Sequence, residues 1–432
     1  MTGVRSDGLR LLASVSRRRA RLGWITWVLT SLLLAVEARA QEAAPLPSPL
    51  SLEMALQVAR DRRAEVAAAR AGARAAEQGP AIVYPLEDPA LLPSVDHLPV
   101  RLDGINASVA VEQRLPLSRL RRYRREAATA ERDRARTVIA RTGLDIELDA
   151  AAAFFMLWER REMARIVDEQ LALSRELVVA ASARYEGATG TQSDVLRAEI
   201  EVSRLEMQRR VLDSEIAAAE AMLRATLGCP PETAVPALAP WTAPAAPPSA
   251  TAAITTAKER RPELAAGQAE IRAAEADIRA MRSMYAPMAM LRTGAAYTMV
   301  GGPGVMLMFG ITLPRRNRVG AQVREAEAMT AMARSDLAAM QRMVEGEAAS
   351  AQALVLAASA RVAALRDDVV PRAERTVAPT LAGYAAGQIP LVSVVEAARA
   401  LWSVQAEMIT AQMQLAIAWA RLRRAIGEEA GP

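Results

Sequence analysis

An internal repeat constrains the fold of this chain more than any other feature of its sequence. The stretch RAEVAAARAGARAAE at residues 63–77 returns as RPELAAGQAEIRAAE at residues 261–275, with nine of fifteen positions identical. Two further landmarks recur at nearly the same spacing: Leu115 and Pro116 lie 198 residues before Leu313 and Pro314, and Tyr185 lies 199 residues before Tyr384. Because three landmarks keep one order and one spacing, the two halves are predicted to fold into the same unit.

Long helices are predicted for most of each half. No proline occurs from Leu117 to Cys229, and apolar residues recur there at spacings of three and four, the period of an amphipathic helix. As one helix, residues 118–184 would be about 100 Å long, which is too long for a compact domain. Two glycines in YEGATGTQSD (185–194) then predict a turn into a second long helix. Abundant alanine and only 3% aromatic residues favour close helix packing in a tube or a coiled coil.

A short pair of strands is predicted in the middle of each half. In the second half, PMAMLRTGAAYTMV and GVMLMFGITL flank the turn signal GGPG. In the first half, INASVAVEQRL alternates in part, whereas AIVYPLEDPALLP (81–93) is interrupted by proline and predicts a weak strand at best. Each half therefore reads helix, two strands, long helix, tight turn, long helix, and the predicted class is mainly α with a small β portion.

The N-terminus predicts a secretory signal. Arginines precede the apolar run 22–36, and the small residues Ala38 and Ala40 place the cleavage site after Ala40. The alternative is an uncleaved anchor helix. No later segment has eighteen uninterrupted apolar residues, so no further membrane helix is expected. The expected organisation is a signal peptide (1–40), a first repeat (41–229), a Pro/Ala linker (230–250), a second repeat (251–428) and a tail (429–432).

Charge and the scarcity of cysteine and histidine exclude several classes of function. Without residues 1–40 the chain is close to neutral, so it lacks the basic surface of a nucleic-acid-binding protein. Cys229 and His97 are the only residues of their kinds, which excludes a His/Cys zinc site and a histidine-based triad within one chain. We expect Cys229 to be a buried, inert thiol, and we predict neither enzymatic activity nor a cofactor.

The two halves, the Leu-Pro entry into each long helix, the tyrosine-containing turns and LRATLG (223–228) together resemble the TolC-like outer membrane efflux protein family. Within it, the chain looks most like the outer membrane components of heavy-metal RND-type pumps. The resemblance covers about residues 51–428. It implies a homotrimer in which each protomer gives four strands to a 12-stranded outer membrane β-barrel, continuous with an α-helical periplasmic barrel.

The same resemblance implies a function and partners. The chain would be the passive exit duct of a tripartite efflux system in the outer membrane of a Gram-negative cell. Its partners would be a periplasmic adaptor protein, an inner membrane RND-type transporter and outer membrane lipid. Heavy-metal cations, drugs and secreted polypeptides stay open as substrates. The alternative is a periplasmic helical-hairpin scaffold or bridging protein without a pore.

The resemblance also places a periplasmic gate and an adaptor contact at the two helix-to-helix turns. The family motif has a tyrosine, a glycine three residues later and an acidic residue nine later. The candidates in this chain are Tyr185, Gly187 and Asp194 in the first turn, and Tyr384, Gly387, Ser393 and Glu396 in the second. Gly187 stands one position early, and Ser393 replaces the acidic residue, while Glu396 lies twelve after the tyrosine. Threefold symmetry would make rings of carboxylates from Asp194 and Glu396; the alternatives are a helix cap and a solvated residue.

Methionine is concentrated around the second strand pair, where seven of the nineteen fall within 28 residues. Met288, Met290, Met306 and Met308 are weak candidates for binding a soft metal ion such as Cu(I), which thioethers favour. We favour the alternative, in which they face lipid or fill packing gaps.

Few residues are available for the aromatic girdle of a membrane barrel, and Tyr285, Tyr297 and Phe309 are the best candidates. The arginine-rich run 119–126 lies beside the predicted barrel, where it meets either lipid head groups or water; we favour water.

Overall fold

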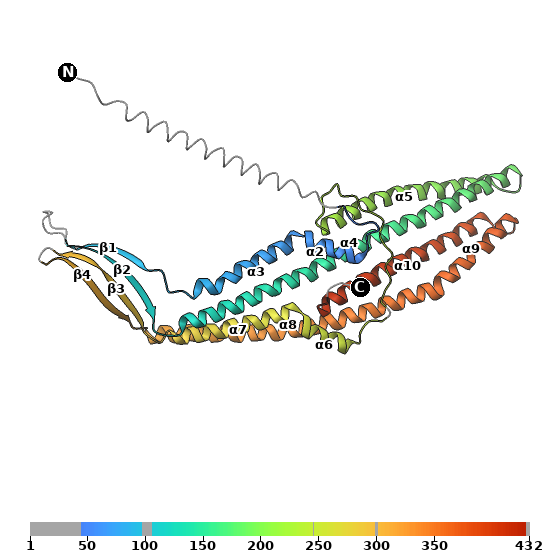
Figure 1. Cartoon of the computed structure of the whole chain (residues 1–432). Coiled ribbons are helices and arrows are strands. Elements are labelled where there is room, and N and C mark those ends of the chain that lie inside the picture. Colours follow the sequence, from blue (N-terminus) through green and yellow to red (C-terminus); the bar gives the residue numbers. More distant parts are fainter. Residues whose placement is uncertain (1–44, 97–105, 245, 299–300, 429–432) are drawn as a thin grey trace, which may run out of the picture.

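The computed structural model describes residues 45–96, 106–244, 246–298 and 301–428. The expected signal peptide, its cleavage site and His97 lie outside these residues. The described molecule is elongated: its strands lie at one end, and the turns of two long helical hairpins lie at the other (Figure 1).

The duplicated unit predicted from the repeat is confirmed. The first half contains α2 (Leu52–Arg62), α3 (Ala64–Val83), β1 (Ala90–Asp96), β2 (Asn106–Pro116), α4 (Leu120–Glu186) and α5 (Gln192–Thr226). The second contains α6 (Ala250–Arg260), α7 (Pro262–Ser283), β3 (Met288–Thr298), β4 (Gly302–Thr312), α8 (Arg316–Ala364), η2 (Leu365–Val369), α9 (Val370–Ala385) and α10 (Leu391–Ile426). In both halves a short helix precedes the echoed helix, because the backbone is extended at Arg63 and again at Arg261.

The long helix that follows the two strands is continuous in the first half and interrupted in the second. In the first half, α4 runs for 67 residues without interruption. In the second half, the π-helical turn η2 separates α8 from α9, and Pro371 follows within α9. Proline has no N–H for the helical ladder and its ring crowds the preceding turn, so a local widening of the helix accommodates it. The stretch Arg316–Ala385 is also, among the described residues, the one long and apolar enough to cross a membrane by length and composition. Part of it, α8, packs against α6, α7 and α10.

One antiparallel sheet joins the two halves at the strand end of the molecule. Its strand order is β1-β2-β3-β4, so β2 and β3 form the seam, with Ala110 opposite Gly294. The weak strand expected within residues 81–93 lies later, at Ala90–Asp96, because Pro80 and the following residues belong to α3. Pro93 is tolerated in β1 because β1 is an edge strand of the described sheet.

The two faces of the sheet differ sharply in polarity. Side chains alternate along each strand, and the uninterrupted register assigns every residue to a face. One face carries exposed apolar side chains: Leu91, Val95, Val109, Val111, Tyr297, Val305, Leu307, Phe309 and Ile311. The opposite face carries Ser94 hydrogen-bonded to Ser108 (3.0 Å) and an ion pair between Glu112 and Arg292 (2.5 Å).

The four candidate methionines share this second, polar face. On β3, Met288 and Met290 lie four and two residues before Arg292, and so on the same face as Arg292. On β4, Met308 lies directly opposite Arg292, and Met306 is two residues from Met308. Strand register therefore places them on the face opposite the exposed apolar side chains, and whether they pack or face lipid stays a prediction.

The main hydrophobic core lies at mid-length, where helices of both halves meet. Phe154 and Leu157 of α4 are fully buried there against residues of α2, α5 and α10. Trp241, from the linker segment, packs edge to face on Phe155 with ring centroids 5.1 Å apart. Cys229 lies at the edge of this core and is half-buried, and the Arg62 guanidinium donates a hydrogen bond to its Sγ (3.3 Å). The thiol is thus less buried than expected.

Candidate functional site

All seven candidate residues lie on or beside the two turns at the end of the molecule opposite the sheet (Figure 1). The first turn connects α4 with α5, and the second connects α9 with α10. Among the described residues, no group of three or more His, Cys, Asp or Glu side chains is arranged to hold a metal ion. The chemistry of this end is therefore that of hydrogen bonds, aromatic contacts and charge.

Asp194 closes a capping box at the start of α5. Thr191 is the N-cap, its Oγ1 donates to Asp194 Oδ2 (2.8 Å), and the Asp194 backbone N–H donates to Thr191 Oγ1 (3.3 Å). This arrangement satisfies backbone donors that a helix start leaves open. Asp194 thus has the capping role that was its alternative interpretation, and its place at a constriction stays a prediction.

Both turns place one residue in the left-handed backbone region, at the third position after the tyrosine. In the second turn this residue is Gly387 (φ 75°), and in the first it is Ala188 (φ 58°). Gly187, the candidate that stands one position early, has φ −77°, so its backbone conformation does not require glycine. The two turns therefore have the same shape, although Ala188 holds it at a cost of about 1 kcal/mol that glycine would avoid.

The two tyrosines have different environments. Tyr185 is exposed, whereas only 4% of Tyr384 is accessible, within a small core that includes Leu177, Val394 and Leu391. Burial raises the pKa of the Tyr384 phenol, an effect that the nearby Arg184 charge opposes. The structure therefore gives the second tyrosine a packing role and leaves the first available to another molecule.

Arg184, a residue without a sequence signal, joins the two turns. Its guanidinium carbon lies 4.7 Å from the centre of the Tyr384 ring, and it donates hydrogen bonds to the backbone carbonyls of Tyr384 and Thr189. Its repeat counterpart is Gly383, which carries no side chain, so the internal comparison gave no hint of this contact. The ring contact and the hydrogen bond to the Tyr384 carbonyl hold the first hairpin against the second at their tips.

Glu396 and Ser393 lie in the first two turns of α10. Glu396 is exposed, and Ser393 is half-buried. One helical turn beyond Glu396, Arg399 forms an ion pair with Glu201 of α5, whose side chain is 5% exposed. This pair joins α5 of the first repeat to α10 of the second. Glu396 is free of such a bridge within the described residues, and its predicted position toward a lumen stays a prediction.

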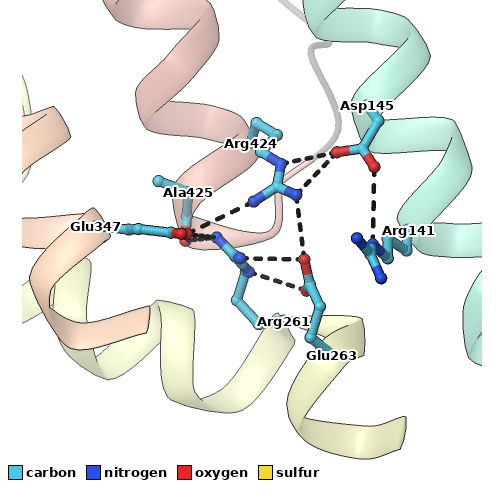
Figure 2. Close-up of polar contacts among 7 residues, drawn as sticks. All are labelled: Arg141, Asp145, Arg261, Glu263, Glu347, Arg424 and Ala425. Atoms are coloured by element: carbon cyan, nitrogen blue, oxygen red, sulfur yellow. Dashed lines mark hydrogen bonds and ion pairs between the residues drawn. The ribbon is translucent and has the colours of Figure 1, made fainter. Parts of the chain in front are cut away.

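An ionic network, shown in Figure 2, lies where the two halves meet at mid-length, with Arg261 and Glu263 buried and Asp145 and Glu347 partly exposed. Arg261, whose side chain is 3% exposed, pairs with Glu263 (2.9 Å) and Glu347 (2.9 Å), and donates to the Ala425 carbonyl (3.1 Å). Arg424 extends the network from Glu263 (3.2 Å) to Asp145 of α4 (2.8 Å). The network therefore ties α7, α8 and α10 of the second repeat to α4 of the first.

The first repeat contains a looser version of the same arrangement. Arg63 pairs with Glu65 (3.0 Å), approaches Asp149 (4.0 Å) and reaches the Thr226 carbonyl (3.5 Å). The side chains of Glu65 and Asp149 are more than half exposed. The arginine and glutamate shared by the two echoed stretches thus have the same structural task, to hold the start of the echoed helix against the long helices.

The comparisons with known proteins agree with this architecture. The family model described as "Outer membrane efflux protein" matches residues 253–428. Among curated proteins, the outer membrane efflux protein BepC of Brucella suis biovar 1 (strain 1330) is 26% identical over 287 residues. That match covers 64% of this chain and 62% of BepC, so the chain spans less than two thirds of the relative's length.

Solved structures have the same fold at low sequence identity. The outer-membrane channel OprN is 17% identical with a TM-score of 0.75, over 87% of this chain and 89% of OprN. The outer membrane protein VceC from Vibrio cholerae is also 17% identical, with a TM-score of 0.74 over 88% of this chain and 97% of VceC. The second half of the chain therefore matches the outer membrane efflux protein family, and the whole chain is similar in fold to solved outer-membrane channels.

Proposed function

We propose that this protein is the outer membrane exit duct of a tripartite efflux system and works as a homotrimer. The observation that carries the proposal is the sheet with two free edges. Within the described residues, β1 and β4 each pair on one side alone. Unpaired strand edges cannot stay in a bilayer, because lipid offers no hydrogen-bond partners. Three copies placed edge to edge would close a barrel of twelve strands and satisfy those groups.

The faces of the sheet support the same assembly. In a closed barrel the apolar face, which includes Val305, Phe309 and Ile311, would contact lipid. The polar face, with Glu112 and Arg292, would line the lumen. A periplasmic scaffold without a pore has no use for an exposed apolar sheet, so this observation favours a duct over the bridging alternative.

The helical wall also leaves apolar surface for neighbouring protomers. Large apolar side chains exposed on the helices include Ile200, Met207, Val211, Met329, Met332, Leu354 and Leu356. A groove of about 530 Å³ runs between α8 and α10, lined in part by Leu354, Met413 and Ile417. Packing against the helices of two further copies would cover such surface and close the tube.

The remaining parts of the proposal concern the tip and the cargo. The turns that carry Tyr185 and Glu396 would form the periplasmic gate and contact a periplasmic adaptor, which in turn would bind an inner membrane RND-type pump. Heavy-metal cations are our first proposal for the cargo, with drugs and secreted polypeptides as the alternatives. The duct itself would conduct passively.

Membrane fractionation tests the duct proposal directly. A duct is expected in the outer membrane fraction as a trimer that dissociates on heating, as seen on gels. A soluble monomer in the periplasm would refute the duct and favour the scaffold. For the cargo, the gene would be deleted and growth scored with copper, silver, zinc and cobalt against hydrophobic drugs. Lost drug tolerance with unchanged metal tolerance would reject metal cations.

Loosening the tip is expected to open the duct. The change is Arg184→Ala, which removes the ring contact with Tyr384 and the hydrogen bond to its backbone carbonyl between the two turns. A cation–π contact is worth about 1 kcal/mol, so the ratio of open to closed channels should rise about fivefold. Single-channel conductance in planar bilayers measures this ratio. The matched control is Arg175→Ala, which removes an exposed ion pair with Glu206 inside one hairpin. Equal conductance in the two variants would contradict the role of Arg184.

A further inference from the structure

We propose that four arginines at the strand-to-helix junctions bind the phosphate groups of anionic phospholipids in the periplasmic leaflet of the outer membrane. They are Arg119, Arg315, Arg316 and Arg318, which we call the basic collar. This inference rests on the proposed function, since it needs the sheet to lie in the membrane. The proposed partner of this surface is the head group of a lipid.

The position of the collar follows from the apolar face of the sheet. The apolar face of β4 includes Ile311, and Leu313, just beyond the end of the strand, is 76% exposed. Arg315 comes two residues after Leu313, and its own backbone is extended (φ −75°, ψ 110°). The lipid-facing stripe therefore passes directly from an exposed leucine to an arginine.

The first repeat has a related transition, although not at the equivalent residues. Leu117 follows the end of β2 and is 60% exposed, and Arg119 comes two residues later as the N-cap of α4, where the backbone is not extended (φ −80°, ψ 18°). An apolar stripe that ends in a long cationic side chain is typical of the boundary between acyl chains and head groups. Because both repeats contain it, a trimer would carry the collar around its whole circumference.

Within the described structure, no protein group compensates the charge of the collar arginines. All four are exposed, and within the described residues none has a side-chain hydrogen bond or ion pair. Elsewhere in the described chain, arginine usually lies beside a carboxylate, as Arg136 does with Glu77 (2.7 Å) and Arg334 does with Glu275 (2.7 Å). The collar is therefore a concentration of positive charge without internal compensation.

The helix starts at the collar point to an anion as the missing partner. Neither α4 nor α8 has an acidic residue in its first turn or a cap from its N-cap side chain, although at α4 the Leu120 N–H donates to Ser118 Oγ (3.4 Å). By contrast, α5 begins with a capping box and α2 has both a serine cap and Glu53. Cations at a helix N-terminus oppose its partial positive charge and are unfavourable alone. A phosphate group would compensate the arginines and the open backbone donors together.

Two tyrosines mark the same level of the molecule. Tyr84 ends α3 just before β1, and Tyr285 follows α7 just before β3. Both are exposed, and Arg121 and Arg125 lie over the Tyr84 ring, at 5.0 and 4.7 Å from its centre. Tyrosine is enriched where a membrane meets water. Tyr285 was a girdle candidate, whereas Tyr84 had been missed because it lies in the proline-rich segment.

Lipid binding by the purified trimer tests the collar. The variant replaces all four arginines with glutamine, and the probe is phosphatidylglycerol compared with phosphatidylcholine, added to the detergent-solubilised trimer and counted by native mass spectrometry. A basic residue near a charged membrane surface contributes about fivefold in affinity, so the variant should lose phosphatidylglycerol binding by about tenfold or more. Replacing the same residues with lysine should preserve most of the binding.

A matched control removes the same charge elsewhere. Arg197, Arg210, Arg342 and Arg375 are also exposed without side-chain partners in the described structure, but they lie far along the helices. Their replacement with glutamine should leave phosphatidylglycerol binding unchanged. Equal loss in both quadruple variants, or no loss in either, would overturn the collar.

Two further measurements distinguish a failure of the lipid assignment from a failure of the proposed function. Inorganic phosphate is added as a competitor to the native trimer; displacement of phosphatidylglycerol at equal concentration would assign the site to free phosphate and overturn the lipid assignment. Trimer formation in the outer membrane is read on heat-modifiable gels for every variant. A native chain that forms no membrane trimer refutes the proposed function, whereas normal trimers without phosphatidylglycerol preference refute the collar alone.

Discussion

Replacing Arg261 with alanine is expected to destabilise the protein by about 3 kcal/mol, because it removes one of the two arginines that compensate the buried Glu263 carboxylate. Glu263 has a side chain that is 8% exposed, and it would keep Arg424 as its remaining cation. The Ala425 carbonyl would also lose its guanidinium donor. The measurement is the urea midpoint of the detergent-solubilised protein, followed by circular dichroism.

The internal repeat provides the control for this prediction. Arg63→Ala removes the equivalent arginine, but its partners Glu65 and Asp149 are 54% and 60% exposed and can return to water. Surface ion pairs contribute about 1 kcal/mol or less, so this variant should be destabilised by that amount. Equal destabilisation by the two substitutions would show that burial of the second network is unimportant.

Acid should weaken the native network in a defined direction. Burial by itself would raise the pKa of Glu263, but backbone hydrogen bonding, Arg261 and Arg424 outweigh it and hold the pKa below its ordinary 4.5. Stabilisation by Glu263 is therefore complete above about pH 4.5 and is lost as the pH falls through the lower, folded-state pKa. The difference in urea midpoint between the native protein and Arg261→Ala should accordingly shrink below pH 4.5 and stay constant above it.

Replacing Gly294 with alanine is expected to prevent assembly of the barrel. A Cβ atom at this position would lie 2.1 Å from the Val109 carbonyl oxygen and 2.6 Å from the Ala110 Cα. Both atoms belong to the backbone of β2, so no side-chain rotation can relieve the overlap. Separating the strands would cost about 3 kcal/mol, which corresponds to a loss of trimer of more than tenfold.

Gly304→Ala is the matched control for the sheet. It introduces the same methyl group on the adjacent strand β4, where no atom lies within 4 Å of the new Cβ. Trimers of this variant should appear in the outer membrane at the native level, as measured on heat-modifiable gels. Trimer of Gly294→Ala at the same level as Gly304→Ala would contradict the close approach of β2 and β3.

Much of the architecture was predictable, because it depends on interactions between residues near each other in sequence. Apolar spacing of three and four specified α4 and α5, and the glycines of YEGATGTQSD specified the break between them. The sequence missed the division of the echoed helices at Arg63 and Arg261, and it misplaced β1. Both errors occur where a single backbone position, or a proline, decides the boundary against the general pattern.

The candidate site was predictable to a smaller degree. The turns themselves, and the capping alternative for Asp194, could be read from local residue types. The contact of Arg184 with Tyr384 could not, because it joins residues 200 positions apart and has no counterpart in the repeat. The left-handed residue of the first turn was also hidden, since Ala188 carries no sign of that conformation.

By itself, the sequence determined that this protein consists of two equivalent units of long helices and short strands, because periodicity and turn residues act within a few positions. The tertiary structure alone decided which face of the sheet carries Met306 and Met308, which arginines are compensated and which are not, and which of two equivalent networks is buried. These properties depend on strand register and on packing between distant segments, where a shift of one residue or a few ångströms reverses the environment of a side chain.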